Sequence, residues 1–244
     1  VLSNASVEEM KSVPAHRLAA ERLVVAGPSE KLPTTLAPMQ AELGDAAFNH
    51  TDWTWEPKLD GYRVLAFVEG AGEQVSVKLR TRRGLDLAAD FPKVCAELRK
   101  QAVETMILDA EIVAFDAEGR PSFNAMQNRS AQTERAVLYC FDLLHFAGVN
   151  LRQAPYTDRR RYLAQALLPS PLVQLVHSQD DGVALQAAAD ASGLEGVVGK
   201  RKNSRYEAGK RSASWLKVKS ITSADFVIGG YSQGKGARSP LGAL

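Results

Sequence analysis

The alternation of apolar and polar residues predicts two paired strands in the first half of the chain. From Tyr62 to Val68 and from Gln74 to Arg82, side chains alternate with a period of two, which is typical of half-buried strands. The segment EGAG between them has turn chemistry, so the two strands are expected to form a hairpin. Helical spacing over 86–102 and a strand over 106–119 follow.

The second half continues with single helices between strands. The expected elements are strands over 135–146, 172–178 and 194–202 and helices over 157–168 and 182–193. Thr157 is expected to open the first of these helices and Gly193 to close the second. Paired strands followed by isolated helices indicate an α+β domain in which antiparallel sheets are flanked by helices.

The two ends differ from this middle part. Residues 1–30 show no sustained period and are expected to be a linker or N-terminal extension, so the main domain is predicted over 31–220. Residues 221–244 are too few to fold alone, and with the initial valine they suggest a fragment of a longer protein. Cys95 and Cys140 are expected to be reduced core residues.

Composition and charge narrow the classes of protein. Apolar residues make up 45% and charged residues 24%, with no membrane-spanning run or signal peptide, so we expect a cytoplasmic monomer. Residues 200–219 hold eight Lys or Arg and one Glu, a net charge of +7 in a chain whose total is +2. Lys200, Lys210 and Arg211 are therefore candidates for binding a nucleic-acid backbone, with a solvated charged face as the alternative.

The segment WTWEPKLDGYRVLAF, residues 53–67, contains a candidate nucleophile. A lysine attacks only as a neutral amine, which requires desolvation or nearby positive charge. Trp53, Trp55 and Pro57 could shield Lys58, and Arg63 could supply positive charge. An amine that attacks phosphorus forms a bond that is readily transferred onward, so Lys58 could carry a nucleotidyl group. The alternative is an exposed lysine before the turn LDGY.

Acidic and basic residues on separate strands could complete such a site. Asp60, Glu111 and Glu195 interrupt or border apolar segments, and a buried carboxylate needs a cation or ligand, here Mg²⁺ or Mn²⁺. A structural arginine partner is the alternative for the two glutamates. In WLKVK, Lys217 and Lys219 share one face of a strand and could grip an α-phosphate, unless they only protect a sheet edge.

Taken together, the motifs identify a family resemblance. KLDGYR, RTRRG, LDAEIVAFD, YCFDLLHFAG, LEGVVGK and WLKVK follow one another between residues 56 and 219. This set resembles the adenylation (nucleotidyltransferase) domain of ATP-dependent DNA ligases. The closing DFVIGGYSQGKGARSPLGAL is similar to the start of the OB-fold domain that follows it, in the form found in the ligase module of bacterial non-homologous end-joining ligases. The resemblance implies a covalent nucleotidyltransferase (ATP-grasp-like) fold, then a truncated OB-fold.

The resemblance also implies a role for each matching position, beginning with the nucleotide. Lys58 would attack the α-phosphate of ATP and carry AMP as a phosphoramidate. Glu56 would recognise the adenine amino group, and Phe141 would stack on the ring. Arg63 and Glu111 would contact the ribose.

The remaining roles concern phosphates, metal and DNA. Asp60 would lie near the reacting hydroxyl or the metal, and Glu195, like Glu111, would lie near the metal. Lys217 and Lys219 would hold the α-phosphate, and Arg82 would meet the 5′-phosphate of a nick. Nicked double-stranded DNA is thus the implied substrate, in a nucleoid-associated setting. Ku-like partners and polymerase or nuclease domains in a longer chain remain open.

Two departures and two rival functions accompany this resemblance. The family's Ser-Arg dipeptide is Thr81-Arg82 here, and its last motif, near the end of the OB domain, is absent from these residues. We therefore expect these 244 residues to self-adenylate slowly and to seal nicks poorly unless the remainder is supplied. The rivals are an RNA ligase or capping-type nucleotidyltransferase, and a nucleic-acid-binding module without catalysis.

Overall fold

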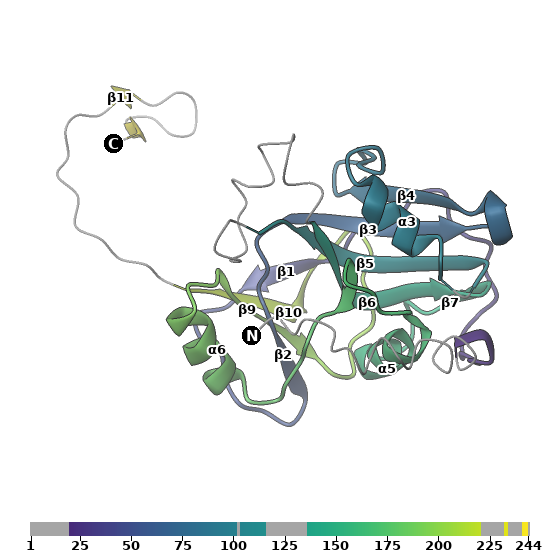
Figure 1. Ribbon diagram of the computed structural model, residues 1–244. Coiled ribbons are helices and arrows are strands. Elements are labelled where there is room, and N and C mark those ends of the chain that lie inside the picture. Colours follow the sequence, from purple (N-terminus) through teal and green to yellow (C-terminus); the bar gives the residue numbers. More distant parts are fainter. Residues whose placement is uncertain (1–19, 102, 116–135, 221–231, 234–240, 244) are drawn as a thin grey trace.

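A six-stranded sheet forms the larger half of the molecule (Figure 1). The computed structural model describes residues 20–101, 103–115, 136–220, 232–233 and 241–243. The strand order is β4-β3-β5-β6-β7, with β8 paired to β6. The strands are β3 (Tyr62–Glu69), β4 (Ser76–Thr81), β5 (Thr105–Val113), β6 (Val137–Phe146), β7 (Val149–Asn150) and β8 (Val173–Leu175). The predicted hairpin is confirmed, because β3 and β4 pair antiparallel from Val64↔Thr81 to Glu69↔Ser76.

A second, four-stranded sheet has the order β1-β10-β9-β2. Its strands are β1 (Gln40–Leu43), β2 (Trp53–Pro57), β9 (Gly196–Arg201) and β10 (Arg211–Lys219). The first two were not predicted. β1 pairs parallel with β10, and β8 pairs parallel with β6, so the expected purely antiparallel sheets are in fact mixed. The predicted α+β class is confirmed.

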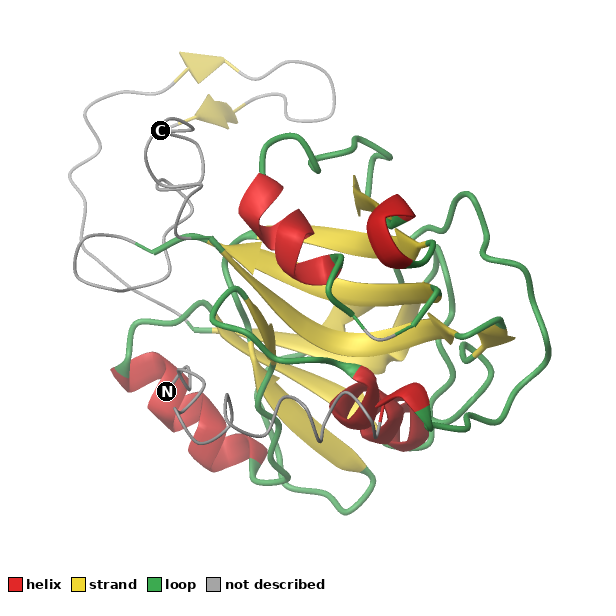
Figure 2. Cartoon of the chain, turned by 45° about the vertical axis from the view of Figure 1, so that its right-hand side comes forward, coloured by secondary structure: helices red, strands yellow, loops and turns green. Residues whose placement is uncertain are grey.

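Three α-helices in the described ranges cover the outer faces of these sheets (Figure 2). They are α3 (Pro92–Leu98), α5 (Tyr156–Ala166) and α6 (Gly182–Ala191). The helix predicted over 86–102 shrinks to α3 because Pro92 starts it, while the Asp86 carboxylate accepts hydrogen bonds from the backbone N–H groups of Leu79 and Ala88 in a preceding turn.

Helix boundaries elsewhere agree in part with expectation. Thr157 does not cap α5, because its backbone N–H donates to the carbonyl of Lys202 and Pro155 occupies the capping position. Gly193 follows the end of α6 with a positive φ of 66°, a conformation that favours glycine. The predicted closing role of Gly193 is therefore confirmed.

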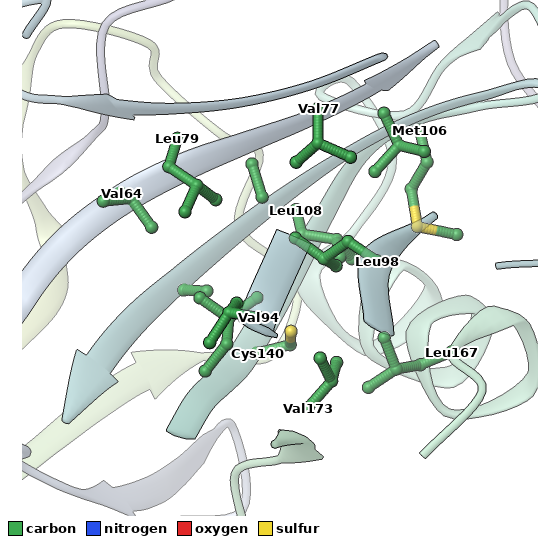
Figure 3. Packing of buried hydrophobic residues seen from close by; sticks show 14 of the residues in the cluster. Val64, Val77, Leu79, Val94, Leu98, Met106, Leu108, Cys140, Leu167 and Val173 are labelled. Atoms are coloured by element: carbon green, nitrogen blue, oxygen red, sulfur yellow. The ribbon is translucent and has the colours of Figure 1, made fainter. Parts of the chain in front are cut away.

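The layers follow from the two faces of each strand. The outer face of the larger sheet packs with α3 and α5 into the main core, part of which Figure 3 shows, including Val64, Leu98 and Cys140. On the inner face, Leu65, Ile107 and Leu144 meet Met39 and Trp215 from the side of the smaller sheet. α6 covers the remaining face of the smaller sheet. The inner faces of the two sheets are thus opposed.

The ends of the chain bear on the predicted domain limits. Residues 28–30 lie along the larger sheet, where the Glu30 N–H donates to Gly148 and Pro28 accepts from Asn150, so this part of the extension is packed. At the other end only β11 (Ser232–Gln233) and β12 (Leu241–Ala243), an antiparallel pair, are described, so most of the predicted OB-fold segment lies outside the described residues.

Two simpler expectations can also be compared with the structure. Cys95 and Cys140 are free and buried, as predicted. Among the helices that the structure describes, none is long and apolar enough to cross a membrane.

Candidate active site

A cavity of about 290 Å³ lies between the inner faces of the two sheets. Both sheets contribute to its walls. The predicted site residues among its lining are Glu56, Lys58, Arg63, Arg82, Glu111, Phe141, Lys200, Arg211 and Lys217. Four other predicted residues, Asp60, Glu195, Lys210 and Lys219, are not part of the lining. The fold thus gathers residues from seven segments around one nucleotide-sized space.

Strand β2 places Glu56 in this cavity by its period of two. Glu56 faces the pocket, whereas the neighbouring Trp55 is fully buried on the opposite face, against Ala189 of α6. An added Cβ on Gly199 of β9 would lie 2.8 Å from the Trp55 indole, so this glycine allows the ring to pack directly on the strand. The expectation that Trp55 shields Lys58 is therefore wrong, because Trp55 points away from the pocket.

Lys58 follows the end of β2 and forms an ion pair with Glu195, the residue before β9. The Lys58 backbone N–H donates to the carbonyl of Gly196 at 2.8 Å, which fixes the lysine beside that strand. The two side chains are 19% and 34% exposed, so the pair is open to solvent. Burial and the Glu195 carboxylate raise the pKa of Asp60 above its usual value, and Lys58 opposes this shift. Both acids thus stand beside the lysine.

At the other end of the pocket, Lys200 forms a deeper pair with Glu56. Its Nζ lies 2.6 Å from Glu56 Oε2, and the two side chains are only 2% and 3% exposed. The ammonium also lies 4.2 Å from the ring centroid of Phe141 and 4.5 Å from that of Trp215. Burial lowers the pKa of Lys200, although Glu56 acts in the opposite direction. The prediction that Lys200 binds the DNA backbone is wrong, because a buried amine cannot reach a duplex outside.

Two residues of α5 that the sequence did not suggest complete this deep end. Tyr156 donates its hydroxyl to Glu56 Oε1, and the Nε of Arg160 lies 3.9 Å from the same oxygen. Tyr156 belongs to no charged run or motif, and the run of three arginines that contains Arg160 resembles an ordinary exposed helix face. Their role arises only because α5 packs against β6, which brings its first turns next to β2.

Arg63 is held rigidly on the inner face of the larger sheet. Its Nε and Nη2 donate to the Asp109 carboxylate at 3.0 and 2.7 Å, and the hydroxyl of Tyr206 donates to the same carboxylate at 2.6 Å. Burial works against its charge, but Asp109 raises the pKa of Arg63 further above its usual value. The guanidinium lies 5.5 Å from the ring centroids of Phe141 and Trp215. Arg63 is therefore a fixed cation in the wall.

Glu111 lies opposite Arg63 in the register of β3 and β5. Asp109, and not Glu111, takes the arginine, and within the described residues Glu111 accepts no hydrogen bond. Burial raises the pKa of Glu111 to about 8, opposed by Arg63 and Lys58 and reinforced by Asp109 and Asp60. A carboxylate kept without a partner beside other acids is suited to a ligand or cation.

The predicted metal ligands do not form a ready cage. No group of three or more His, Cys, Asp or Glu within the described ranges is close enough to hold a metal by itself. Asp60 is nevertheless near enough to raise the pKa of Glu111, and Glu195 is near enough to raise the pKa of Asp60. They form an acidic edge beside Lys58.

Cations surround the opening of the pocket. Arg82 is exposed at the end of β4, and Arg211 is fixed by donating to the Ala41 carbonyl at 2.7 Å and to Gln40 Oε1 at 3.1 Å. Burial, followed by Arg211 and Lys219, lowers the pKa of Lys217. Lys219 and Lys210 are exposed outside the pocket. We call Arg82, Arg211 and Lys217 the cationic rim.

The two opposed sheets thus form a domain with a nucleotide-sized pocket between them, and Lys58 lies at one end of this pocket. A family model described as the ATP-dependent DNA ligase domain matches residues 36–219. The chain belongs to this family of enzymes, which confirms the resemblance recognised from its motifs.

Relatives and solved structures agree with this assignment. The chain is 38% identical over 205 residues to the multifunctional non-homologous end joining DNA repair protein LigD of Mycobacterium tuberculosis, covering 84% of this chain and 26% of that protein. It is 36% identical over 224 residues to LigD of Pseudomonas aeruginosa, covering 89% and 26%. The chain thus spans about a quarter of the length of these curated relatives.

Two solved structures share the fold at similar identity. A mycobacterial DNA ligase D complexed with ATP and MES matches with a TM-score of 0.64 and 36% identity, covering 75% of this chain and 60% of that one. The ligase domain from M. tuberculosis LigD matches with the same TM-score and coverage at 38% identity.

Proposed function

We propose that this domain takes AMP from ATP onto Lys58 and passes it to the 5′-phosphate of a DNA nick, which is then sealed. The observation that carries this proposal is the position of Lys58 in a pocket that has a polar base site at one end and cations at the other. An RNA ligase or capping-type enzyme uses similar lysine chemistry, but membership in the DNA ligase family supports DNA as the substrate.

The deep pair of Glu56 and Lys200 suits the edge of adenine. Adenine presents a donor, its 6-amino group, beside an acceptor, its N1, whereas guanine presents an acceptor beside a donor. A glutamate acceptor 2.6 Å from a lysine donor matches the first pattern and opposes the second. Phe141, half-buried at the wall of the pocket, is positioned as the stacking platform that the motifs imply.

The ribose and phosphates would occupy the space between this end and Lys58. Arg63 and Glu111 line the wall there and would contact the ribose. Lys217 and Arg211 of the cationic rim, with Lys219 beyond it, would stabilise the charge that develops on the α-phosphate when it is attacked.

Three carboxylates fit a divalent cation that the nucleotide brings with it. Mg²⁺ generally needs only one or two carboxylates besides phosphate oxygens, so the acidic edge of Asp60, Glu111 and Glu195 is sufficient without a ready cage. The pKa values of Asp60 and Glu111 are raised mainly by burial and further by neighbouring acids, and a bound cation would favour the charged form of both. Mg²⁺ or Mn²⁺ bound there would neutralise part of the triphosphate charge.

Lys58 must give up a proton before it attacks, and the carboxylate of Glu195 is its nearest acceptor. The Nζ then forms a bond to the α-phosphorus while the bond from this phosphorus to the pyrophosphate oxygen breaks. An oxygen of the DNA 5′-phosphate next displaces Lys58 from AMP. In the last step the 3′-hydroxyl displaces AMP and closes the strand.

The surface near the pocket would receive the DNA. Arg82 at the opening would meet the 5′-phosphate, and Arg211 and Lys210 would contact the backbone alongside it. The names of the relatives support a role in end joining, in which Ku-like partners and polymerase or nuclease domains in a longer chain would take part. We expect the protein to be a monomer in the cytoplasm, associated with the nucleoid.

A covalent labelling experiment tests the proposal. The protein is incubated with ATP labelled at the α-phosphate and Mg²⁺, quenched in acid and examined for label on the chain. We expect label on the parent and on Lys78→Ala, an exposed control on β4, and none on Lys58→Ala. Nicked DNA should then discharge the label.

Two results would count against the proposal. Label that comes from GTP in preference to ATP would favour a capping-type enzyme. An intact, folded chain that remains unlabelled even when a complete OB domain is added would favour a module that only binds nucleic acid.

A further inference from the structure

The first turn of α5 reaches the deep end of the pocket through Tyr156. This side chain is 1% exposed, and its hydroxyl donates a hydrogen bond to Glu56 Oε1. Four residues later on the same face of the helix, the Arg160 Nε lies 3.9 Å from the same oxygen. Both side chains therefore contact Glu56 without being part of the pocket lining.

The two oxygens of the Glu56 carboxylate thus have different partners. Oε1 is engaged by Tyr156 and Arg160, whereas Oε2 lies 2.6 Å from the Nζ of Lys200. A carboxylate anchored through one oxygen cannot rotate freely, so the other oxygen keeps a fixed direction at the pocket wall. This arrangement orients the acceptor that would face the base.

The electrostatics of Tyr156 favour a permanent donor. Burial, followed by the charge of Glu56, raises the pKa of Tyr156 well above its usual value. The hydroxyl therefore keeps its proton at neutral pH and is available as a donor.

We propose that Tyr156 and Arg160 are positioning residues for base selection, holding Glu56 as an oriented acceptor for the 6-amino group of ATP. The proposal rests on the nucleotidyl transfer described above. It assigns to α5 a contribution to nucleotide choice although neither side chain lines the pocket itself.

A second tyrosine on the same helix shows why the hydroxyl, and not only the ring, matters. Tyr162 is also buried, but it belongs to the main core, and among the described residues its hydroxyl accepts only a long contact of 3.4 Å from the Ala26 N–H. Phenylalanine would fill the space of either tyrosine equally well. At position 156 the substitution additionally removes a donor from a buried carboxylate.

The test compares ATP with purine riboside triphosphate, which lacks the 6-amino group. For each, kcat/KM is measured for formation of the Lys58 adduct, with Tyr156→Phe, Arg160→Lys and the matched control Tyr162→Phe. We expect Tyr156→Phe to lower the preference for ATP about tenfold, mainly through KM, with the analogue almost unaffected. Arg160→Lys should lower it about twofold, and Tyr162→Phe should leave it unchanged.

The outcomes separate this proposal from the proposed function. Equal losses for ATP and the analogue in Tyr156→Phe would mean a purely structural role and would overturn the inference. If that variant does not fold, an unchanged preference in Arg160→Lys would overturn it instead. Absence of any adduct in the parent with either triphosphate would contradict the nucleotidyl transfer itself.

Discussion

Two lysine–glutamate pairs close the two ends of one pocket, and they differ chiefly in their contact with water. Glu56 lies in β2 and Lys58 follows this strand. Their partners come from the neighbouring strand β9, which contains Lys200, and from Glu195 just before it. The Lys58–Glu195 pair is 19% and 34% exposed, and the Lys200–Glu56 pair is 2% and 3% exposed. The same kind of ion pair is thus solvent-accessible and separable at one end of the pocket and buried and fixed at the other. This difference suits reaction at the first end and recognition at the second.

The largest expected effect lies at the open end. Lys58→Met should reduce formation of the covalent adduct by roughly 10⁴-fold or more, because the proposed nucleophile is lost. Its free energy of unfolding should change by less than about 1 kcal/mol, since the remaining Glu195 can be hydrated. Acid-quenched labelling and thermal unfolding measure the two quantities. A large loss of stability would contradict the view that this pair is open.

The deep end should respond in the opposite way. Lys200→Met leaves Glu56 buried without its cation, so we expect a loss of about 3 kcal/mol in the free energy of unfolding, or a fall of roughly 6–12 °C in Tm. Denaturant titration of the parent and variant checks this. If both lysine variants lost the same stability, the difference in exposure would have no energetic meaning.

Glu111 sharpens the comparison because it is a half-buried acid that forms no ion pair with any residue that the structure describes. Its pKa is raised from an ordinary 4.5 to about 8, so between these values the folded protein holds a proton that the unfolded chain has lost. The free energy of unfolding should therefore fall as pH rises through this window. Glu111→Gln should remove most of this slope and gain on the order of 1–2 kcal/mol at pH 8, seen as a rise of roughly 2–8 °C in Tm.

The smallest effect is expected for a third pair on the surface. Lys202 Nζ lies 2.7 Å from Asp180 Oδ2, and the side chains are 28% and 66% exposed. Asp180→Asn should change the free energy of unfolding by less than about 0.5 kcal/mol, and only at low salt. Tm measured at two ionic strengths would show it. A loss of unfolding free energy as large as that of Lys200→Met would show that the stability contributed by these pairs does not depend on their burial.

Long, regular strands were predictable because their pattern is local. The β3–β4 hairpin and β6 have enough alternating or apolar residues to be read without knowledge of their partners. β1 has only four residues, and its pairing with β10 depends on a segment about 170 positions away. No local pattern reports such a contact, so β1 was missed.

The site shows the same division between local and distant information. Lys58 and Glu56 lie in a motif, and the fold brings them to one pocket. Lys200 lies in a basic run, and only its place beside Thr54 in the pairing of β9 with β2 shows that it is buried. Tyr156 carries no local signal at all, since its partner Glu56 lies a hundred positions earlier.

The two-residue spacing of Glu56 and Lys58 also fixes the distance between these two residues along the backbone. Glu56 lies in β2 and Lys58 directly follows this strand, so the proposed base acceptor and the proposed nucleophile are two residues apart, roughly 6.6 Å along an extended backbone. Because this separation is set by the backbone, it does not depend on how side chains from distant segments pack. An insertion of one residue here would turn Glu56 towards α6, so we infer that nucleotide choice can be altered by exchanging side chains but not by changing the length of this segment.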